Sequence, residues 1–463
     1  MKGPTVAKSG KEKLFLGVDV GGTKTLAAVV AQSGEILVRN RAATPRRGTA
    51  RDALRAILSV MGGALKLAGI RSSDLSAIGL SVPGVVDPDK GLVVVTPNMN
   101  LTGLAIREPA EKRFGVPVAV GNDVNVGTLG EKWLGAARYV ESAVGIFVGT
   151  GIGGGVILGG KLVRGSREGA GEIGHIVMMP GGPLCGCGNR GCLEALASRS
   201  AIERDIRKAI AAGRKCTVAR LIGTGRQPIK SKVLKDALKA KDPVVTRVMR
   251  KASEILGYAC LTVRHLVDPD VIILGGGVIE ACGKFVLPIV QKIVAADALA
   301  GARPGGLVVE SELGDDAVVL GAAAMAQEHI GGTPLKDAAA AVPSYPKVEH
   351  SCAEEAVVGG KAYTADVVIR GDGKVKPRFK KGSPKDDLPA HQIGPEELER
   401  VCKGGPALLV IGTGLDGHAG LTPEGEEFLR QRRIEVRALP SPKAVKEFNR
   451  AKGRKAAIIH ISC

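Results

Sequence analysis

The sequence predicts an α/β protein with two related lobes, followed by a separate small α/β domain. Apolar strands, glycine turns and helices alternate from Leu14 to about Ile330. The runs LFLGVDVGGTKTLAAVV and AVGIFVGTGIGGGVILGG both have the pattern strand, glycine-rich turn, strand, and they lie about 130 residues apart. This repeat predicts two similar lobes that face each other across a cleft. A further series of strands and helices follows a break in composition near residue 331.

Three parts are therefore expected along the chain. Residues 14–330 form the two-lobed domain. Residues 331–348, GGTPLKDAAAAVPSYPKV, contain three prolines and many small residues, which is typical of a linker. Residues 349–463 have the size of one small α/β domain.

The composition excludes several classes of protein. The 463 residues are 44% hydrophobic and 24% charged, which rules out a wholly disordered or collagen-like chain. No apolar run reaches the roughly 18 residues that span a bilayer. The opening MKGPTVAKSGKEK lacks the apolar stretch of a secretory signal. We therefore expect a cytoplasmic protein without a membrane contact.

The chain is basic, because Lys+Arg exceeds Asp+Glu by 19. Residues 199–251 contribute most of this excess, with sixteen Lys/Arg against four Asp/Glu in helical-looking sequence. Such a segment is typical of solvated faces of amphipathic helices. The alternative is that it attracts a phosphate-rich ligand toward the cleft. Aromatic residues make up only 3% of the chain, so few side chains are available to stack on bases, and we expect no nucleic-acid partner.

Two glycine-rich turns join paired apolar strands, DVGGTK at residues 19–24 and GTGIGGG at residues 149–155. Their glycines permit positive φ and leave backbone N–H groups uncovered, which suits phosphate oxygens. Neither matches a Walker or a Rossmann motif, and each alone can equally be a tight hairpin. Together they favour a nucleotide polyphosphate held between the lobes. A third run, at residues 275–277, either admits a flat ligand or forms a close-packed strand-to-helix corner.

A cluster of metal-binding residue types follows the second turn. His175 in GEIGH and Cys185, Cys187 and Cys192 in CGCGNRGC lie within eighteen residues. One imidazole and three thiolates complete a tetrahedral zinc shell with no open position for water. The spacing therefore predicts a structural Zn²⁺ rather than a redox or merely buried cysteine group.

One carboxylate is a candidate acid–base group. Asn122 and Asp123 follow the strand VPVAV and begin a predicted helix. Asp123 is either an N-cap or a base that accepts the proton of a hydroxyl group attacking a phosphoryl group. The two roles are compatible.

Six motifs in order, DVGGTK, NDVN with LGE, GTGIGGG, GEIGH, CGCGNRGCLE and ILGGG, resemble the ROK family of repressors and sugar kinases, most closely its bacterial glucokinases. The resemblance covers about residues 14–330 and implies a two-lobed actin/hexokinase-like fold of the ribonuclease H type. It makes Asp123 the catalytic base, although Leu104 stands where many members have Trp. The implied nucleotide and phosphate contacts are Asp19, Gly21, Gly22, Thr23, Lys24, Thr150, Gly151, Gly153, Gly275, Gly276 and Gly277. The implied sugar contacts are Gly84, Asn98, Asn122, Asp123, Glu172, His175 and Glu194, with His175 also a zinc ligand.

The resemblance implies ATP-dependent phosphorylation of a hexose, glucose first, by a homodimer with Mg²⁺ and structural Zn²⁺. One alternative is a non-catalytic, sugar-sensing regulatory protein, although it would have no need of Asp123 and two phosphate loops. Another is a kinase for mannose, fructose or an N-acetylhexosamine, or one that uses inorganic polyphosphate. The family's repressors carry a helix-turn-helix before the first phosphate loop, and thirteen residues before Leu14 are too few for one.

The C-terminal segment has its own strand and helix signals. ALLVIGTG, RIEVRAL and AAIIHISC predict strands, while Thr422-Pro423 and Ser441-Pro442 predict helix starts. The segment resembles a small α/β family of unknown activity, which also occurs in a mitochondrial complex I assembly factor, and it is a candidate surface for a protein partner. Its GTG turn at residues 412–414 can bind an anion, and Asp416 with His418 can form an acid–base pair. The alternative is a simple strand-to-helix connection.

Overall fold

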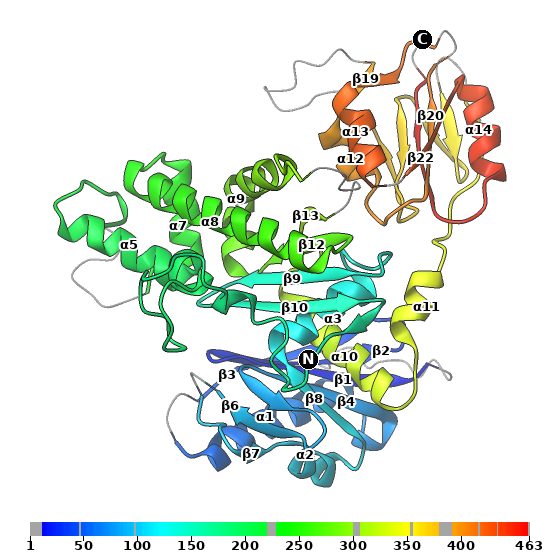
Figure 1. Ribbon diagram of the computed structural model, residues 1–463. Helices are drawn as coiled ribbons and strands as arrows, with labels where there is room; N and C mark the ends of the chain where they lie inside the picture. Colours follow the sequence, from blue (N-terminus) through cyan, green and yellow to red (C-terminus); the bar gives the residue numbers. More distant parts are fainter. Residues whose placement is uncertain are drawn as a thin grey trace. The chain divides into compact units, whose positions relative to one another are not determined.

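The computed structural model describes residues 12–45, 48–96, 99–219, 228–299, 306–351, 355–378, 391–414, 417–432 and 434–461. The chain forms two compact units, with the boundary between Ala339 and Ala340 (Figure 1). Each unit is described by itself below. Within the described ranges, none of the helices combines the length and the apolar character needed to cross a membrane.

The first lobe of unit 1 is built on a five-stranded sheet with the order β3-β2-β1-β4-β8. β1 and β2 form an antiparallel hairpin, and β1, β4 and β8 are parallel. The central strands are almost continuously apolar because both faces of the sheet are covered, one by α1 and the other by α10. The strands are β1 (Leu14–Val20), β2 (Lys24–Ala31), β3 (Ile36–Ala43), β4 (Leu75–Val82) and β8 (Val118–Asn122). The remaining elements are α1 (Ala50–Ala68), α2 (Arg107–Phe114) and a small sheet of β5 (Val85–Asp87), β6 (Leu92–Val95) and β7 (Leu104–Ala105).

The second lobe repeats this topology. Its sheet has the order β11-β10-β9-β12-β13, in which β9 and β10 are antiparallel while β9, β12 and β13 are parallel. The two lobes predicted from the internal repeat are thereby confirmed. The strands are β9 (Ala143–Val148), β10 (Ile152–Leu158), β11 (Lys161–Leu162), β12 (Val271–Gly275) and β13 (Leu307–Glu310). The helices are α4 (Leu193–Ala197), α5 (Arg199–Ala211), α7 (Ser231–Lys239), α8 (Pro243–Val267) and α9 (Gly277–Ala295).

Two helices, α3 (Asp123–Leu134) and α10 (Ala317–His329), lie between the sheets and pack closely on each other (Figure 1). Glycine permits this approach. An added Cβ at Gly321 would lie 1.8 Å from the carbonyl oxygen of Val126, and one at Gly130 would lie 2.0 Å from that of Ala317. The helix pair therefore holds the two lobes together through backbone contacts that larger residues would prevent.

Gly79→Ala is expected to destabilise unit 1 strongly. Gly79 lies in β4 under α10, and a Cβ there would lie 1.8 Å from the carbonyl oxygen of Ala322. Because the backbone of α10 cannot shift without disturbing its packing, we expect the free energy of unfolding to fall by about 3 kcal/mol or more. Gly62→Ala in α1 is the matched control, because no atom lies within 4 Å of its Cβ position. In denaturant unfolding, the free energy of unfolding of Gly62→Ala should rise by roughly 0.5–1 kcal/mol. Equal effects of Gly79→Ala and Gly62→Ala would contradict the close packing of β4 and α10.

The basic stretch forms α5, α7 and part of α8, with residues 220–227 outside the described ranges. In α7, Leu234 and Ala237 are buried while the lysines are exposed, as expected for an amphipathic helix. In α5, Arg207 pairs with Glu203 at 2.9 Å. Part of the basic excess therefore serves local ion pairs and solvated faces.

The segment expected to be a linker is partly helical. α11 (Pro334–Ala340) occupies its first half, and Leu335 and Ala338 are buried in the core that surrounds α10. The sequence signal failed here because a short helix buries only two or three side chains, which leaves little periodicity to detect.

Unit 2 is an α/β domain whose main sheet has the order β18-β17-β23-β20-β22. β20, β22 and β23 are parallel, and β17 is antiparallel to β23. Thr422 caps α13 as predicted, whereas α14 begins at Ser441 with Pro440 in the cap position. The strands of the main sheet are β17 (Val367–Ile369), β18 (Val375–Pro377), β20 (Leu408–Gly412), β22 (Glu435–Leu439) and β23 (Lys455–Ile459). The other elements are β14 (Val348–Ser351), β15 (Ala356–Val358), β16 (Lys361–Tyr363), β19 (Gln392–Ile393), β21 (Gly420–Leu421), α12 (Pro395–Val401), α13 (Pro423–Gln431) and α14 (Ser441–Arg450).

Candidate active site

Polar groups meet at the carboxyl edge of the first sheet. Asp19 of β1 is opposite Ser81 of β4, and Val82 is opposite Asn122 at the end of β8. Because these three strands are parallel, their carboxyl ends lie at one edge, which is where open α/β sheets bind ligands. Asp19, Gly84, Asn122 and Asp123 come together in this way although they are far apart in sequence.

Asn122 orients the start of α3. Its Oδ1 accepts hydrogen bonds from the backbone N–H groups of Val124 and Asn125, so Asn122, not Asp123, is the N-cap. Its Nδ2 donates to the carbonyl oxygen of Gly84 at 2.9 Å and to Asp123 Oδ1 at 3.1 Å. Gly84 has a φ of 90°, and a Cβ there would lie 2.1 Å from the carbonyl oxygen of Val95, so only glycine fits.

Asp123 is the first residue of α3. Because Asn122 caps the helix, the side chain of Asp123 does not have to serve as the N-cap. Burial raises the pKa of Asp123, with a further contribution from the negative charge of Glu172. The hydrogen bonds from Val124 N and Asn122 Nδ2 act in the opposite direction and hold the carboxyl group in one orientation. The site therefore contains an oriented carboxyl group with a raised proton affinity.

Asp19 also has a raised proton affinity. Burial, together with the charge of Asp123, raises the pKa of Asp19 from 3.8 to about 7, although Lys24 and Arg41 act to lower it. Asp19 and Asp123 thus form an acidic pair next to the first glycine turn. Such a pair attracts a cation.

Asp19→Asn is expected to raise the melting temperature more at pH 8 than at pH 4. The folded-state pKa of about 7 lies above the ordinary value of 3.8, so the folded protein loses stability as pH rises between these values. Above pH 7 both states are ionised and the loss is constant. Asparagine does not ionise and so removes this loss of stability. The difference in melting temperature between variant and wild type should therefore widen from pH 4 to pH 7 and then level off. Asp89→Asn, at a side chain that is 90% exposed, is the control, and a pH-independent difference for Asp19→Asn would contradict the raised pKa.

The first glycine turn closes tightly and is tied to the segment before α10. Gly21 N donates to the carbonyl oxygen of Lys24 at 2.9 Å, which makes a compact hairpin turn. The Lys24 ammonium lies 3.1 Å from Asp315 Oδ2. Asp315 and Lys24 in turn influence the carboxyl group of Glu280 in α9, whose pKa is raised first by burial. Lys24 is thus held where first-lobe and second-lobe segments meet.

The second glycine turn is braced by α4 and α5. Gly149 N donates to Gly151 O at 2.9 Å, and Arg199 donates to Thr150 Oγ1 at 2.8 Å. Glu194 Oε2 accepts a hydrogen bond of 2.9 Å from Ile152 N. A Cβ at Gly153 would lie 2.4 Å from Val124 Cγ2, so this predicted phosphate contact is also where β10 packs on α3.

The third glycine run is a strand-to-helix corner. β12 ends at Gly275, and α9 begins at Gly277. Gly276 has a φ of 84°, and a Cβ there would lie 2.8 Å from the carbonyl oxygen of Val148. Close packing accounts for this glycine, and it leaves the N-terminus of α9 beside the second turn.

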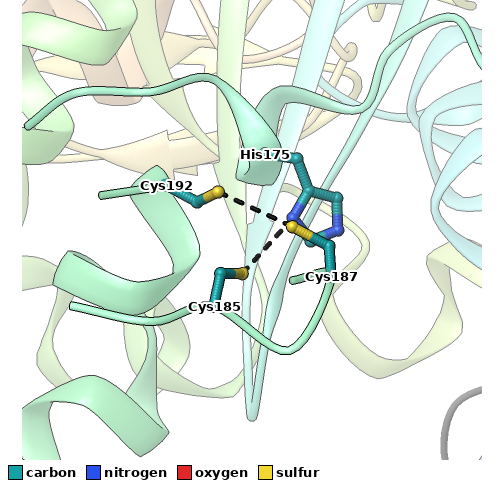
Figure 2. Close-up of side chains that lie close together, drawn as sticks. All are labelled: His175, Cys185, Cys187 and Cys192. Atoms are coloured by element: carbon teal, nitrogen blue, oxygen red, sulfur yellow. Dashed lines mark hydrogen bonds between the residues drawn. The ribbon is translucent and has the colours of Figure 1, made fainter. Parts of the chain in front are cut away.

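The four predicted metal ligands converge. The ligand atoms of His175, Cys185, Cys187 and Cys192 all lie within 4.8 Å of one another (Figure 2). His175 Nδ1 is 3.6 Å from Cys185 Sγ, and Cys187 Sγ is 3.7 Å from Cys192 Sγ. In a zinc tetrahedron with Zn–N near 2.0 Å and Zn–S near 2.3 Å these edges are about 3.5 and about 3.8 Å. These two separations therefore match those of a zinc site.

Three predicted sugar contacts are grouped at the Cys/His cluster. His175 Nδ1 faces the thiol groups, while His175 Nε2 lies 3.9 Å from Glu172 Oε2. Cys185 Sγ lies 3.6 Å from Glu194 Oε1. Glu172, His175 and Glu194 are thus grouped around the cluster, and Glu172 also reaches Asp123 electrostatically. Asn98, another predicted sugar contact, lies outside the described residues.

Glu131 is the last residue of the motif LGE, and no role was predicted for it from the sequence. It is fully buried in α3, where Oε1 accepts from Ser311 Oγ at 2.6 Å and from Leu313 N at 3.0 Å. It therefore fixes the segment that carries Asp315, and with it Lys24. A charged residue on the buried side of an apolar helix was the available signal, but its partner Ser311 lies 180 residues away.

Two lobes of identical sheet topology, with glycine hairpins and carboxylates at the strand ends, define unit 1 as a two-lobed actin/hexokinase-like protein. Two solved structures are similar. A ROK family glucokinase from Streptomyces griseus in complex with glucose and AMPPNP is 36% identical, with a TM-score of 0.60, over 68% of this chain and 99% of its own. The ROK hexokinase from Thermus thermophilus is 34% identical, with a TM-score of 0.58 and the same coverage of both chains.

The chain belongs to the ROK family, whose model matches residues 15–329. The glucokinase of Thermotoga maritima is 35% identical over 321 residues, which are 69% of this chain and 98% of that protein. The Escherichia coli DNA-binding transcriptional dual regulator NagC is 29% identical over 67% of this chain and 74% of its own length. Residues 350–461 match a second family, a protein of unknown function (DUF498/DUF598). Both resemblances in the sequence are confirmed.

Proposed function

We propose that this chain phosphorylates a hexose with ATP, with glucose as the first candidate and Asp123 as the general base. The observation that supports this most is the place of Asp123, at the edge of the sheet between Asp19 of the first glycine turn and Glu172 beside the metal cluster. Similarity to glucokinases over almost their whole length supports the same reaction.

In the proposed reaction, Asp123 accepts the proton of a hexose hydroxyl group as that oxygen bonds to the γ-phosphorus and ADP leaves. Asn122 and Val124 N hold the carboxyl group in place, so little reorganisation is needed at the moment of transfer. Carboxylates and amides around the sugar would discriminate against hexoses that lack a hydroxyl group. Mg²⁺, when bound, would neutralise charge on the donor phosphates, and Asp19 is the carboxylate that suits it.

We further propose that His175, Cys185, Cys187 and Cys192 hold a structural Zn²⁺. The edge lengths of the cluster support this. Four protein ligands leave no position for a substrate, so the ion would act by fixing the orientation of His175 and the loop around it.

The proposal extends to assembly and location, and these parts rest on the family resemblance. We propose a cytoplasmic homodimer whose small-molecule partners are the hexose and ATP. Unit 2 is the candidate contact for a protein partner.

A coupled assay of ADP release over a panel of hexoses tests the kinase proposal. The panel comprises glucose, mannose, fructose and N-acetylhexosamines, each with ATP and with inorganic polyphosphate. We expect turnover with glucose and ATP in the ordinary range for enzymes, about 1–10³ per second. Hexose binding without turnover on any donor would instead support a sugar-sensing regulator; the relative NagC is a DNA-binding transcriptional regulator by name.

A further inference from the structure

Unit 2 contains a chain of ionisable side chains that the proposed kinase reaction does not use. Asp366 and His460 are 0% and 1% exposed, and His391 is partly buried. His460 Nδ1 lies 2.5 Å from Asp366 Oδ2, and His460 Nε2 lies 3.1 Å from His391 Nδ1. The two imidazole rings are perpendicular, with centroids 5.1 Å apart. We call Asp366, His460 and His391 the histidine relay.

The ionisation of Asp366 determines which nitrogen atoms of the histidine relay carry protons. Burial alone would raise the pKa of Asp366, but hydrogen bonds from Ile461 N and His460, together with the charge of Arg378, hold it below its usual range. Asp366 is therefore a carboxylate and only accepts hydrogen bonds. His460 must then donate from Nδ1, which leaves a lone pair on its Nε2 when the ring is neutral.

The same argument determines the tautomer of His391. The lone pair on His460 Nε2 accepts a hydrogen bond from His391 Nδ1–H, so the lone pair of His391 is on Nε2. Among the described residues, His391 Nε2 has no hydrogen-bond partner. The relay thus ends on a basic nitrogen of a partly exposed residue, with a buried carboxylate available to stabilise positive charge behind it.

The histidine relay lies at the edge of the sheet where ligands bind. His460 directly follows β23, and its backbone N–H donates to the carbonyl oxygen of Gly412 at the end of β20. β20, β22 and β23 are parallel, so this is the carboxyl edge of the sheet.

The predicted anion site of the GTG turn is not supported at this edge. Thr413 N donates to Leu439 O at 2.9 Å and Gly414 N to Ser441 Oγ at 3.1 Å, so both N–H groups are already engaged. Asp416, predicted to pair with His418, lies outside the described residues. The ionisable groups that do meet at this edge, Asp366, His460 and His391, are distant in sequence.

The charge of the described groups next to the relay bears on the class of ligand. Arg378 contacts Asp366 at 3.3 Å and Glu397 at 2.7 Å, and these three groups together carry a formal charge of −1. An anionic substrate is therefore disfavoured. Proton transfer to or from a neutral or cationic molecule is the chemistry that this arrangement of a carboxylate and two imidazoles fits.

We propose that unit 2 carries an acid–base catalytic site, in which His391 Nε2 takes a proton from water or from a hydroxyl group of a neutral or cationic small molecule. With a neutral ester, a water O–H bond breaks and its proton moves to His391 Nε2. The water oxygen bonds to the carbonyl carbon, the ester C–O bond breaks, and the leaving oxygen takes the proton back from His391. His460 and Asp366 are positioning residues that hold the ring and stabilise its positive charge.

Chemical labelling of the full chain with diethyl pyrocarbonate tests the basic nitrogen directly. We expect His391 to be modified about ten times faster than His418, which is more exposed and lies 6.2 Å away between ring centroids. Asp366→Asn should remove this advantage because an amide can donate to His460 Nδ1 and reverse its tautomer. Slower or equal labelling of His391 in the wild type would overturn the proposal without any variant. Continued protection of buried His460 shows that each sample is folded.

Hydrolysis of p-nitrophenyl acetate by the full chain tests catalysis. His391→Gln should lower the protein-catalysed rate of ester hydrolysis by about tenfold or more. His329→Gln, at an exposed histidine of unit 1, should leave this rate unchanged. The anionic p-nitrophenyl phosphate should be neither hydrolysed nor inhibitory. Equal ester hydrolysis by wild type and His391→Gln would overturn the proposal. Hexose-dependent ADP release should be unchanged in His391→Gln, so this test is independent of the kinase proposal.

Discussion

Asp123→Asn is expected to lower the kcat of hexose phosphorylation by about 10²–10⁴-fold, the usual contribution of a general base. Asparagine has the same shape as aspartate, and its amide oxygen still accepts the hydrogen bonds from Val124 N and Asn122 Nδ2. It cannot take up the hydroxyl proton. Hexose affinity should therefore stay close to wild type while turnover is lost.

Coupled ADP release and calorimetric titration with the hexose measure the two quantities separately. Asp89→Asn is the matched control, since it makes the same chemical change at a side chain that is 90% exposed. Near-normal turnover in Asp123→Asn would show that another group is the base. A loss of both affinity and turnover, with an unchanged melting temperature, would assign Asp123 to sugar binding alone.

Metal removal is expected to have the second large effect. Purified protein should contain about one zinc ion per chain, and its removal by a chelator should lower the melting temperature by about 10 °C, as a loss of a few kcal/mol does in a unit of this size. The reason is that Cys185 and Cys192 are buried and Ala195 is the one further described residue of their hydrophobic cluster, so little apolar packing holds the loop without the ion. The KM for the hexose should rise as well, because Glu172 and Glu194 lie against the cluster.

Cys192→Ser should reproduce these effects, whereas Cys216→Ser, at a thiol outside the cluster, should not. Metal content by mass spectrometry, melting temperature and hexose kinetics are measured on the same preparations. A metal-free sample with wild-type stability and wild-type KM would refute the structural role of the ion.

Local patterns in the chain predicted the elements well. Glycine turns between apolar runs marked both hairpins, and Thr422-Pro423 marked the start of α13. Local patterns were less reliable where a nearby residue competed for the same role. Asn122 took the cap expected of Asp123 because its side chain reaches both Val124 N and Asn125 N.

Contacts between distant segments were beyond these patterns. Lys24 is a predicted phosphate contact, and its ammonium group also contacts Asp315, 291 residues away. Asp416 and His418, considered from the sequence as a possible acid–base pair, lie two positions apart, and Asp416 is outside the described residues. In the structure His460 contacts Asp366, 94 residues away.

The sequence alone determined the order of strands and helices, the two glycine turns and the Cys/His cluster, because each depends on residues within about twenty positions of one another. The tertiary structure decided which polar groups share a site and which of them hold protons. Parallel strands bring Asp19 and Asn122 to one edge of a sheet, and burial next to Asp123 then raises the pKa of Asp19 to about 7. Such a shift depends on the surrounding packed protein and on a neighbouring charge that is remote in the chain, and neither is present before the lobes have folded.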